Sequence, residues 1–129
     1  MRMIEPRIDH VGLNVSDLEE SIEFYKHLFG FHVIEKWDDP KQAFVGKGDV
    51  VLGLMEVSAY DFHTYTKAHI AFPCKPEEFK GVVSVVRQLS SEILSGPKPQ
   101  RGGETMLFRD PSGNIIEICY PSLTGGNET

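Results

Sequence analysis

The segment DPSGNIIEICY, residues 110–120, combines a turn with a strand-like run of isoleucines and has a glutamate in the middle of that run. Asp, Pro, Gly and Asn favour turns, whereas Ile and Tyr favour strands. Because successive strand side chains point to opposite faces, Glu117 shares a face with Ile115 and Cys119. The opposite face is apolar and suits packing against a helix. The carboxylate therefore points to a second face, where it needs a polar or ionic partner.

The remaining sequence predicts an ordered series of strands and helices around this segment. The helix over residues 16–30 has a capping box formed by Ser16 and Glu19, and Gly30 is placed to end it. The segment 95–103, SGPKPQRGG, predicts a Pro/Gly-rich loop, and residues 58–67 predict another loop. The predicted strands cover residues 8–15, 31–37, 42–48, 50–57, 68–74, 91–94, 104–109 and 114–120, and a second helix covers residues 75–90.

This order is strand, helix and three strands, repeated once, which indicates an internal repeat. The segments DHVGLNV and AHIAFPC each have a histidine followed by apolar and small residues. These histidines, His10 and His69, are 59 positions apart, because 69 − 10 = 59. Glu56 and Glu117 are 61 positions apart, because 117 − 56 = 61. The repeat therefore predicts two modules, residues 8–57 and 67–121, related by a pseudo-twofold axis, each with one histidine and one glutamate.

Strand alternation places the two histidines among small neighbours. His10 shares a face with Gly12 and Asn14, and His69 shares one with Ala71. Small neighbours leave room for a cup. Imidazoles and carboxylates that converge in such a cup need a cation for their lone pairs, and this ligand mixture suits one divalent metal: Zn²⁺, Ni²⁺, Mn²⁺, Co²⁺ or Fe²⁺.

Composition excludes several classes of protein. The 129-residue chain is 40% hydrophobic and 25% charged, which predicts one compact domain, residues 1–129. Its net charge of −6 argues against nucleic-acid and anionic-membrane partners. The start of the sequence resembles no signal peptide, so the expected location is the cytoplasm, where Cys74 and Cys119 are expected to be free thiols.

The double repeat, the opening DHVGLNVSDLEESIEFYKHLFGF, the HIAF strand and LFRDPSGNIIEI resemble the vicinal oxygen chelate superfamily over about residues 8–121. This superfamily includes glyoxalase I, fosfomycin- and bleomycin-resistance proteins and extradiol dioxygenases. The resemblance implies an α+β fold in which two βαβββ modules form a mixed curved sheet around a metal cup. It also implies His10, His69 and Glu117 as metal ligands. Glyoxalases add a fourth ligand on the fourth strand, where this chain has Glu56.

The resemblance further implies a small-molecule substrate and a homodimer. The leading expectation is a metal-dependent glyoxalase-like lyase or isomerase, with Glu56 as catalytic proton carrier. The alternatives are a fosfomycin-resistance-like transferase or hydrolase, a metal-free binding protein of the bleomycin-resistance type, and a dioxygenase. The fosfomycin branch has a threonine where this chain has Gly12, and an arginine after the last glutamate that CYPSLTGG lacks. Lys98 and Arg101 are candidate cations for glutathione carboxylates.

Several of these residues also have simpler interpretations. Glu117 could pair with Arg109, and Glu56 could be a solvated residue near a strand end. Cys119 could serve only in packing. His27 and His32 are expected at the surface, and His63 lies in the predicted loop with Tyr60 and Tyr65.

Overall fold

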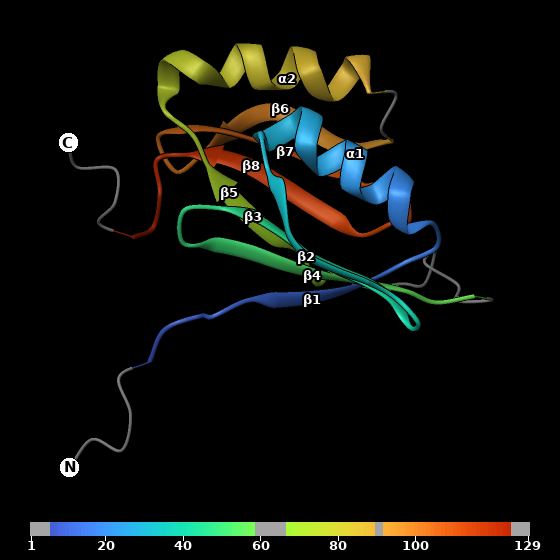
Figure 1. Ribbon diagram of the computed structural model, residues 1–129. Helices are drawn as coiled ribbons and strands as arrows, with labels where there is room; N and C mark the ends of the chain where they lie inside the picture. The colour runs from blue at the N-terminus through green and yellow to red at the C-terminus, as the bar shows by residue number, and fades with distance from the viewer. Residues whose placement is uncertain (1–5, 59–66, 90–91, 125–129) are drawn as a thin grey trace. The chain divides into compact units, whose positions relative to one another are not determined.

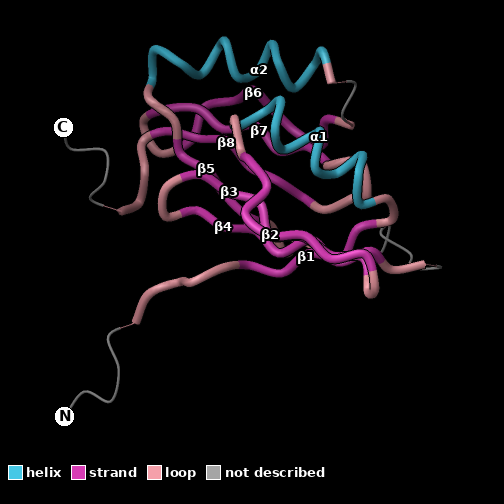
Figure 2. The backbone as a smooth tube through the Cα atoms, viewed as in Figure 1, coloured by secondary structure: helices cyan, strands magenta, loops and turns pink. Residues whose placement is uncertain are grey.

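The computed structural model describes residues 6–58, 67–89 and 92–124, and the chain forms two compact units, Met1–Ala59 and Tyr60–Thr129. Each unit follows the order strand, helix and three strands, which confirms the predicted α+β fold of two βαβββ modules. Figure 2 shows the main α-helix of each unit in cyan against its magenta strands. In the described part of the chain, no helix is long and apolar enough to cross a membrane. The predicted loop containing His63 lies outside the described residues.

The first unit is a four-stranded sheet with one helix. Its strands are ordered β1-β4-β3-β2; β1 is parallel to β4, and the other neighbours are antiparallel. The elements are β1 (Val11–Val15), α1 (Leu18–Phe29), β2 (His32–Asp38), β3 (Lys41–Lys47) and β4 (Val50–Glu56).

Helix α1 begins one residue later than the predicted capping box requires. Asp17 is the N-cap, and its side chain accepts a hydrogen bond from the Glu20 backbone N–H at 3.0 Å. Asp is as good an N-cap as Ser, so the Ser16–Glu19 box was wrong by one position. Gly30 ends the helix as predicted, with a φ of 73° that suits a residue without Cβ.

The core of the first unit lies between α1 and the sheet, where α1 packs on β3 and β4. We call this side of the sheet its helix face and the opposite side its far face. The buried apolar residues of the helix and the strands are Val15, Leu18, Ile22, Phe24, Tyr25, Leu28, Ala43, Val45, Leu52 and Leu54. Alternation assigns Leu52 and Leu54 to the helix face and leaves Gly53 and Met55 on the far face.

The second unit repeats the arrangement of the first, with the strand order β5-β8-β7-β6. Strands β5 and β8 are parallel, and the other neighbours are antiparallel. Its elements are β5 (Ile70–Pro73), the short 3₁₀ helix η1 (Pro76–Glu78), α2 (Phe79–Gln88), β6 (Ile93–Gln100), β7 (Gly103–Arg109) and β8 (Ile115–Tyr120). Helix α2 lies on the helix face of this sheet (Figure 1) and packs on β8.

Strand β6 is longer than predicted and includes most of the expected Pro/Gly-rich loop. It lies at the edge of its sheet, and its pairing with β7 shifts register between Ser95 and Lys98. Proline has no backbone donor, but an edge strand with an irregular ladder tolerates Pro97 and Pro99. The loop prediction for residues 95–103 was therefore wrong for residues 95–100.

The turn before β8 is organised by a buried aspartate. One carboxylate oxygen of Asp110 accepts hydrogen bonds from the backbone N–H groups of Ser112 and Asn114, at 2.9 and 2.8 Å. The other accepts from the Asn114 side-chain amide at 3.0 Å. Gly113, with a φ of 96°, completes the turn. This network fixes where β8 begins and hence which of its residues face α2.

Candidate metal centre

Glu117 is a buried carboxylate on β8, with only 7% of its surface exposed. It pairs with Leu107 on β7 and with Ala71 on β5, and it points away from the apolar residues that face α2. Thr105 Oγ1 donates a hydrogen bond of 2.5 Å to Glu117 Oε2. The predicted alternation of β8 is thus confirmed, and the alternative pairing of Glu117 with Arg109 is wrong: the Arg109 guanidinium contacts Glu92 and the Gly113 carbonyl.

The second oxygen of Glu117 faces the imidazole of His69. Glu117 Oε1 lies 3.1 Å from His69 Nε2. On the other side of the ring, His69 Nδ1 lies 2.7 Å from the Lys67 carbonyl oxygen, which can only accept a hydrogen bond. Nδ1 therefore carries a proton, and a neutral ring would present a lone pair at Nε2 to a negatively charged oxygen. A cation or a second proton between these two atoms removes that repulsion.

In the first unit, the imidazole of His10 is also oriented by an acceptor next to its Nδ1 atom. It lies one residue before β1, and its Nδ1 is 2.8 Å from Asp9 Oδ2. The hydrogen bond from His10 lowers the pKa of the Asp9 carboxyl. With Nδ1 donating to the carboxylate, Nε2 is the ring nitrogen available to a ligand, as in carboxylate–histidine–metal arrangements. The ring also contacts Phe44 edge-on, with centroids 5.1 Å apart.

The described residues contain no group of three His, Cys, Asp or Glu side chains close enough to hold a metal ion. The second unit contributes the pair His69 and Glu117, and the first contributes His10. The assignment of all three to one metal stays a prediction. The donor set of the pair nevertheless fits a divalent cation: two lone pairs face each other, and the remaining polar atoms of both side chains are engaged by Thr105 and Lys67.

Glu56 has a different environment from the one expected of a metal ligand. Its side chain lies on the helix face, where Oε2 accepts a hydrogen bond from the Leu18 backbone N–H at 2.9 Å. Its other oxygen lies 3.9 Å from Lys41 Nζ. A carboxylate at this point satisfies a free donor at the start of α1 and interacts favourably with the helix dipole. This position argues against Glu56 as a ligand beside His10.

The strand register explains the error. Gly12, two residues after His10, pairs with Gly53, whereas Ala71, two residues after His69, pairs with Glu117. The structural equivalent of Glu117 is therefore Gly53, and the offset between the halves is 64 positions, since 117 − 53 = 64. The predicted equivalence of Glu56 with Glu117, at 61 positions, was wrong by three residues. The far face of β4 offers no carboxylate at this rung.

Both cysteines are free thiols, as predicted. Cys119 is buried on the same face as Glu117, opposite Thr105. Burial, and next the charge of Glu117, raises the pKa of the Cys119 thiol. A thiol with a raised pKa is a poor nucleophile near neutral pH, which favours a packing role for Cys119.

Thr105 and Asp9 are the supporting residues that sequence reasoning missed. Thr105 had a detectable signal, because alternation along GETMLFR places this polar residue on the same face as Leu107, opposite the face of Met106 and Phe108. Asp9 precedes His10 directly, but adjacency along the chain gives no information about side-chain orientation.

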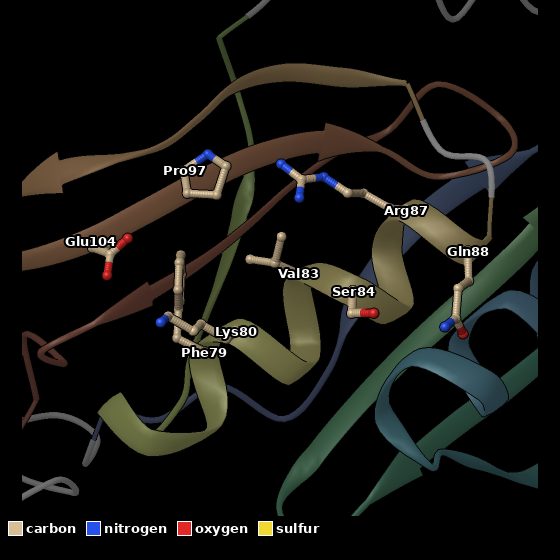
Figure 3. Close-up of a pocket in the computed structure, with 8 residues that line it drawn as sticks. All are labelled: Phe79, Lys80, Val83, Ser84, Arg87, Gln88, Pro97 and Glu104. Atoms are coloured by element: carbon tan, nitrogen blue, oxygen red, sulfur yellow. The ribbon is translucent and has the colours of Figure 1, made fainter.

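A separate pocket of about 620 Å³ lies between α2 and the strands of the second unit (Figure 3). Lys80, Val83 and Arg87 line it from the helix, and Pro97 and Glu104 line it from the strands. Glu104 alternates with Thr105 on β7, so this pocket is on the helix face, opposite Glu117. The pocket is therefore not part of the candidate metal centre.

Comparison with known proteins identifies the family of the chain. The sequence matches the family model of the Glyoxalase/Bleomycin resistance protein/Dioxygenase superfamily over residues 7–118. The chain belongs to this superfamily.

The relatives of the chain include several named enzymes. It is 32% identical to a virulence protein of Salmonella typhimurium, with 92% of this chain and 86% of the relative covered. It is 31% identical to the metallothiol transferase FosB of Lysinibacillus sphaericus, with 90% and 83% covered. A lactoylglutathione lyase of Arabidopsis thaliana is 29% identical, but the match spans 92% of this chain and only 45% of that protein.

Solved structures support the fold. The fosfomycin resistance protein FosX of Listeria monocytogenes, in complex with Mn(II) and 1S,2S-dihydroxypropylphosphonic acid, superimposes with a TM-score of 0.81. The two chains are 22% identical, and 93% of this chain and 94% of FosX are covered.

Proposed function

We propose that the protein is a divalent-metal-dependent enzyme that acts on a small molecule with two neighbouring oxygen atoms. His10, His69 and Glu117 are its metal ligands in this proposal. The observation that carries it is the 3.1 Å approach of His69 Nε2 to Glu117 Oε1 while His69 Nδ1 is committed to a carbonyl oxygen. A buried carboxylate that faces the lone pair of a partly exposed imidazole is stabilised by a shared cation.

The side chains around the ligands have defined roles in this proposal. Thr105 holds the Glu117 carboxylate in one orientation, and Asp9 and the Lys67 carbonyl fix the ring tautomers of the two histidines. A bound divalent metal would supply Lewis-acid stabilisation of negative charge that develops on a substrate oxygen.

We further infer that the reaction is an addition rather than a proton-transfer isomerisation. In an addition of the epoxide-opening type, the sulfur of a thiol or the oxygen of a water bonds to a carbon of a strained C–O ring and the ring C–O bond breaks. The ring oxygen stays in the product, takes the electron pair and receives the proton that the nucleophile gives up. No carboxylate shuttle is required. Gly53 at the position equivalent to Glu117, together with Glu56 on the helix face, supports this reaction class. The similarity to a metallothiol transferase supports it further.

A proton-transfer isomerase is the second candidate function, because relatives named lactoylglutathione lyase match most of the chain. It would require a base other than Glu56. Parallel assays with fosfomycin plus thiols, and with methylglyoxal plus thiols, separate the two reaction classes. Turnover of the second mixture alone would refute the addition chemistry.

Metal analysis tests the ligand assignment. His10→Ala and His69→Ala should each lower the metal content of protein purified without chelator to well below one equivalent. His27→Ala is the matched control, because His27 Nδ1 also lies 2.8 Å from a backbone carbonyl oxygen, on the exposed surface of α1. Full metal content in either ligand variant would refute the assignment.

We also propose a homodimer, in which the ligands come from one or both subunits. Each sheet has an edge strand with exposed apolar residues: Val33 and Ile34 lie on β2, and Ile93 lies on β6. Such edges favour association with a second copy of the chain. Light scattering of the metal-loaded protein at micromolar concentration should give twice the chain mass of 14.5 kDa. A 14.5 kDa species would refute the dimer.

A further inference from the structure

The far face of the first sheet, on which His10 lies, has no lysine or arginine among its described strand residues. The strand lysines Lys36, Lys41 and Lys47 alternate onto the helix face. Two of them pair with carboxylates there, Lys36 with Glu19 and Lys41 with Glu56. The ionisable strand residues that the register assigns to the far face are Glu35, opposite Phe44, and His32, opposite Gly46. The described strands of this face therefore offer no lysine or arginine to pair with an anionic group.

A small pocket of about 80 Å³ opens on this far face beside His10. Trp37 and Phe44 form an aromatic wall, with ring centroids 5.7 Å apart in an edge-to-face arrangement. Met55, 41% exposed, and the polar Gln42 complete its sides. The full set of lining residues is His10, Gly12, Trp37, Gln42, Ala43, Phe44, Gly53, Leu54 and Met55. Apart from the histidine, none of these side chains is ionisable.

Two glycines keep this pocket open. A Cβ atom at Gly12 would lie 3.5 Å from Met55 Cε, an ordinary contact distance. A Cβ atom at Gly53 would lie 3.0 Å from Phe44 Cε1 and 3.7 Å from His10 Cδ2. A side chain at either position would occupy space next to the imidazole. The absence of side chains there is what gives the histidine an apolar neighbouring volume.

We propose that this pocket binds a short, uncharged apolar substituent of the substrate, attached next to the oxygens that the metal chelates. The inference rests on the proposed metal-dependent function and specifies its substrate class. A volume of 80 Å³ holds roughly three non-hydrogen atoms, at about 30 Å³ for each water-sized group. The aromatic wall and Met55 provide apolar contact, and the pocket lining has no lysine or arginine to pair with a negatively charged substituent.

Hydroxamates of different chain length test this inference, because they chelate divalent metals through two neighbouring oxygens. Binding to the metal-loaded protein is measured by calorimetry and by the emission of Trp37, the single tryptophan of the chain. Butyrohydroxamate has two more methylenes than acetohydroxamate and should bind about fifteenfold more tightly, at roughly fourfold per buried methylene. The monohydroxamate of succinic acid, with a carboxylate at the end of its chain, should bind at least tenfold more weakly than butyrohydroxamate.

The variant Gly12→Ala should abolish the preference for butyrohydroxamate, because its added methyl group occupies part of the pocket that the longer chain needs. Gly81→Ala is the control, since Gly81 lies in α2 and its added Cβ would meet no atom within 4 Å. If both hydroxamates bind equally, or if the preference survives in Gly12→Ala, the pocket inference is wrong and the metal function stands. If no hydroxamate binds to the metal-loaded protein, both proposals fall.

Discussion

Replacing Thr105 by valine tests whether Glu117 is a metal ligand held by a buried hydrogen bond. Thr105 is fully buried, and its Oγ1 donates to Glu117 Oε2 at 2.5 Å. Valine has nearly the same shape but no hydroxyl, so Thr105→Val leaves one oxygen of a buried carboxylate without its donor. Loss of such a bond destabilises the metal-free protein by about 1–3 kcal/mol. Loss of a supporting residue of this kind lowers metal affinity by about 10- to 100-fold.

Two measurements check this prediction. Calorimetric titration with Mn²⁺ or Zn²⁺ gives the metal affinity, and urea unfolding of the metal-free protein gives the free energy of unfolding. Thr105→Ser is the control: it retains the hydroxyl, so its metal affinity should stay within about threefold of wild type even if the lost methyl lowers stability. Wild-type metal affinity in Thr105→Val would refute the role assigned to this contact.

Three further predictions concern residues outside the metal ligands. Glu56→Ala should lower the free energy of unfolding by about 1–2 kcal/mol, because Leu18 N–H loses its acceptor, while metal content stays unchanged; a loss of metal would restore Glu56 as a ligand. Asp110→Ala should destabilise by about 3 kcal/mol or more in thermal unfolding, because three donors lose one carboxylate; a change below about 1 kcal/mol would contradict this. Burial raises the pKa of the Cys74 thiol from 9.0 to about 11, so the folded state keeps a proton that the unfolded state loses. Stability should therefore fall as pH rises from 9 to 11, and Cys74→Ser should show a smaller fall in denaturation curves; identical slopes would contradict it.

Most helices and strands were predictable because the sequence patterns within them agreed with the positions that they occupy in the folded units. The apolar stripe of α1 and the stop at Gly30 are local features, and both were correct. The start of α1 was misplaced because Ser16 and Asp17 are both good caps, and only the hydrogen bond to Glu20 decides between them. Strand β6 was predicted too short because its prolines are permitted by its edge position, which is a property of the sheet.

The candidate site was predictable to the extent that strand alternation determines it. Alternation correctly separated Glu117 from the residues facing α2. It could not align the two halves, because the alignment depends on which residues pair across neighbouring strands. The pairing of Gly12 with Gly53 became visible only in the sheet, and it argues against Glu56 as the equivalent of Glu117. The contacts of Asp9 and Thr105 depend on side-chain orientation, which sequence spacing does not specify.

The unequal pair Gly53 and Glu117 bears on how such a site could change during evolution. A glutamate at position 53 would restore the symmetry of the two halves and would place a carboxylate beside His10. Its Cβ would meet the ring of Phe44 at 3.0 Å, closer than most native contacts. A glutamate at position 53 therefore requires the Phe44 ring to shift by a few tenths of an ångström. A smaller residue at position 44 would remove this conflict, so the two positions are expected to change together.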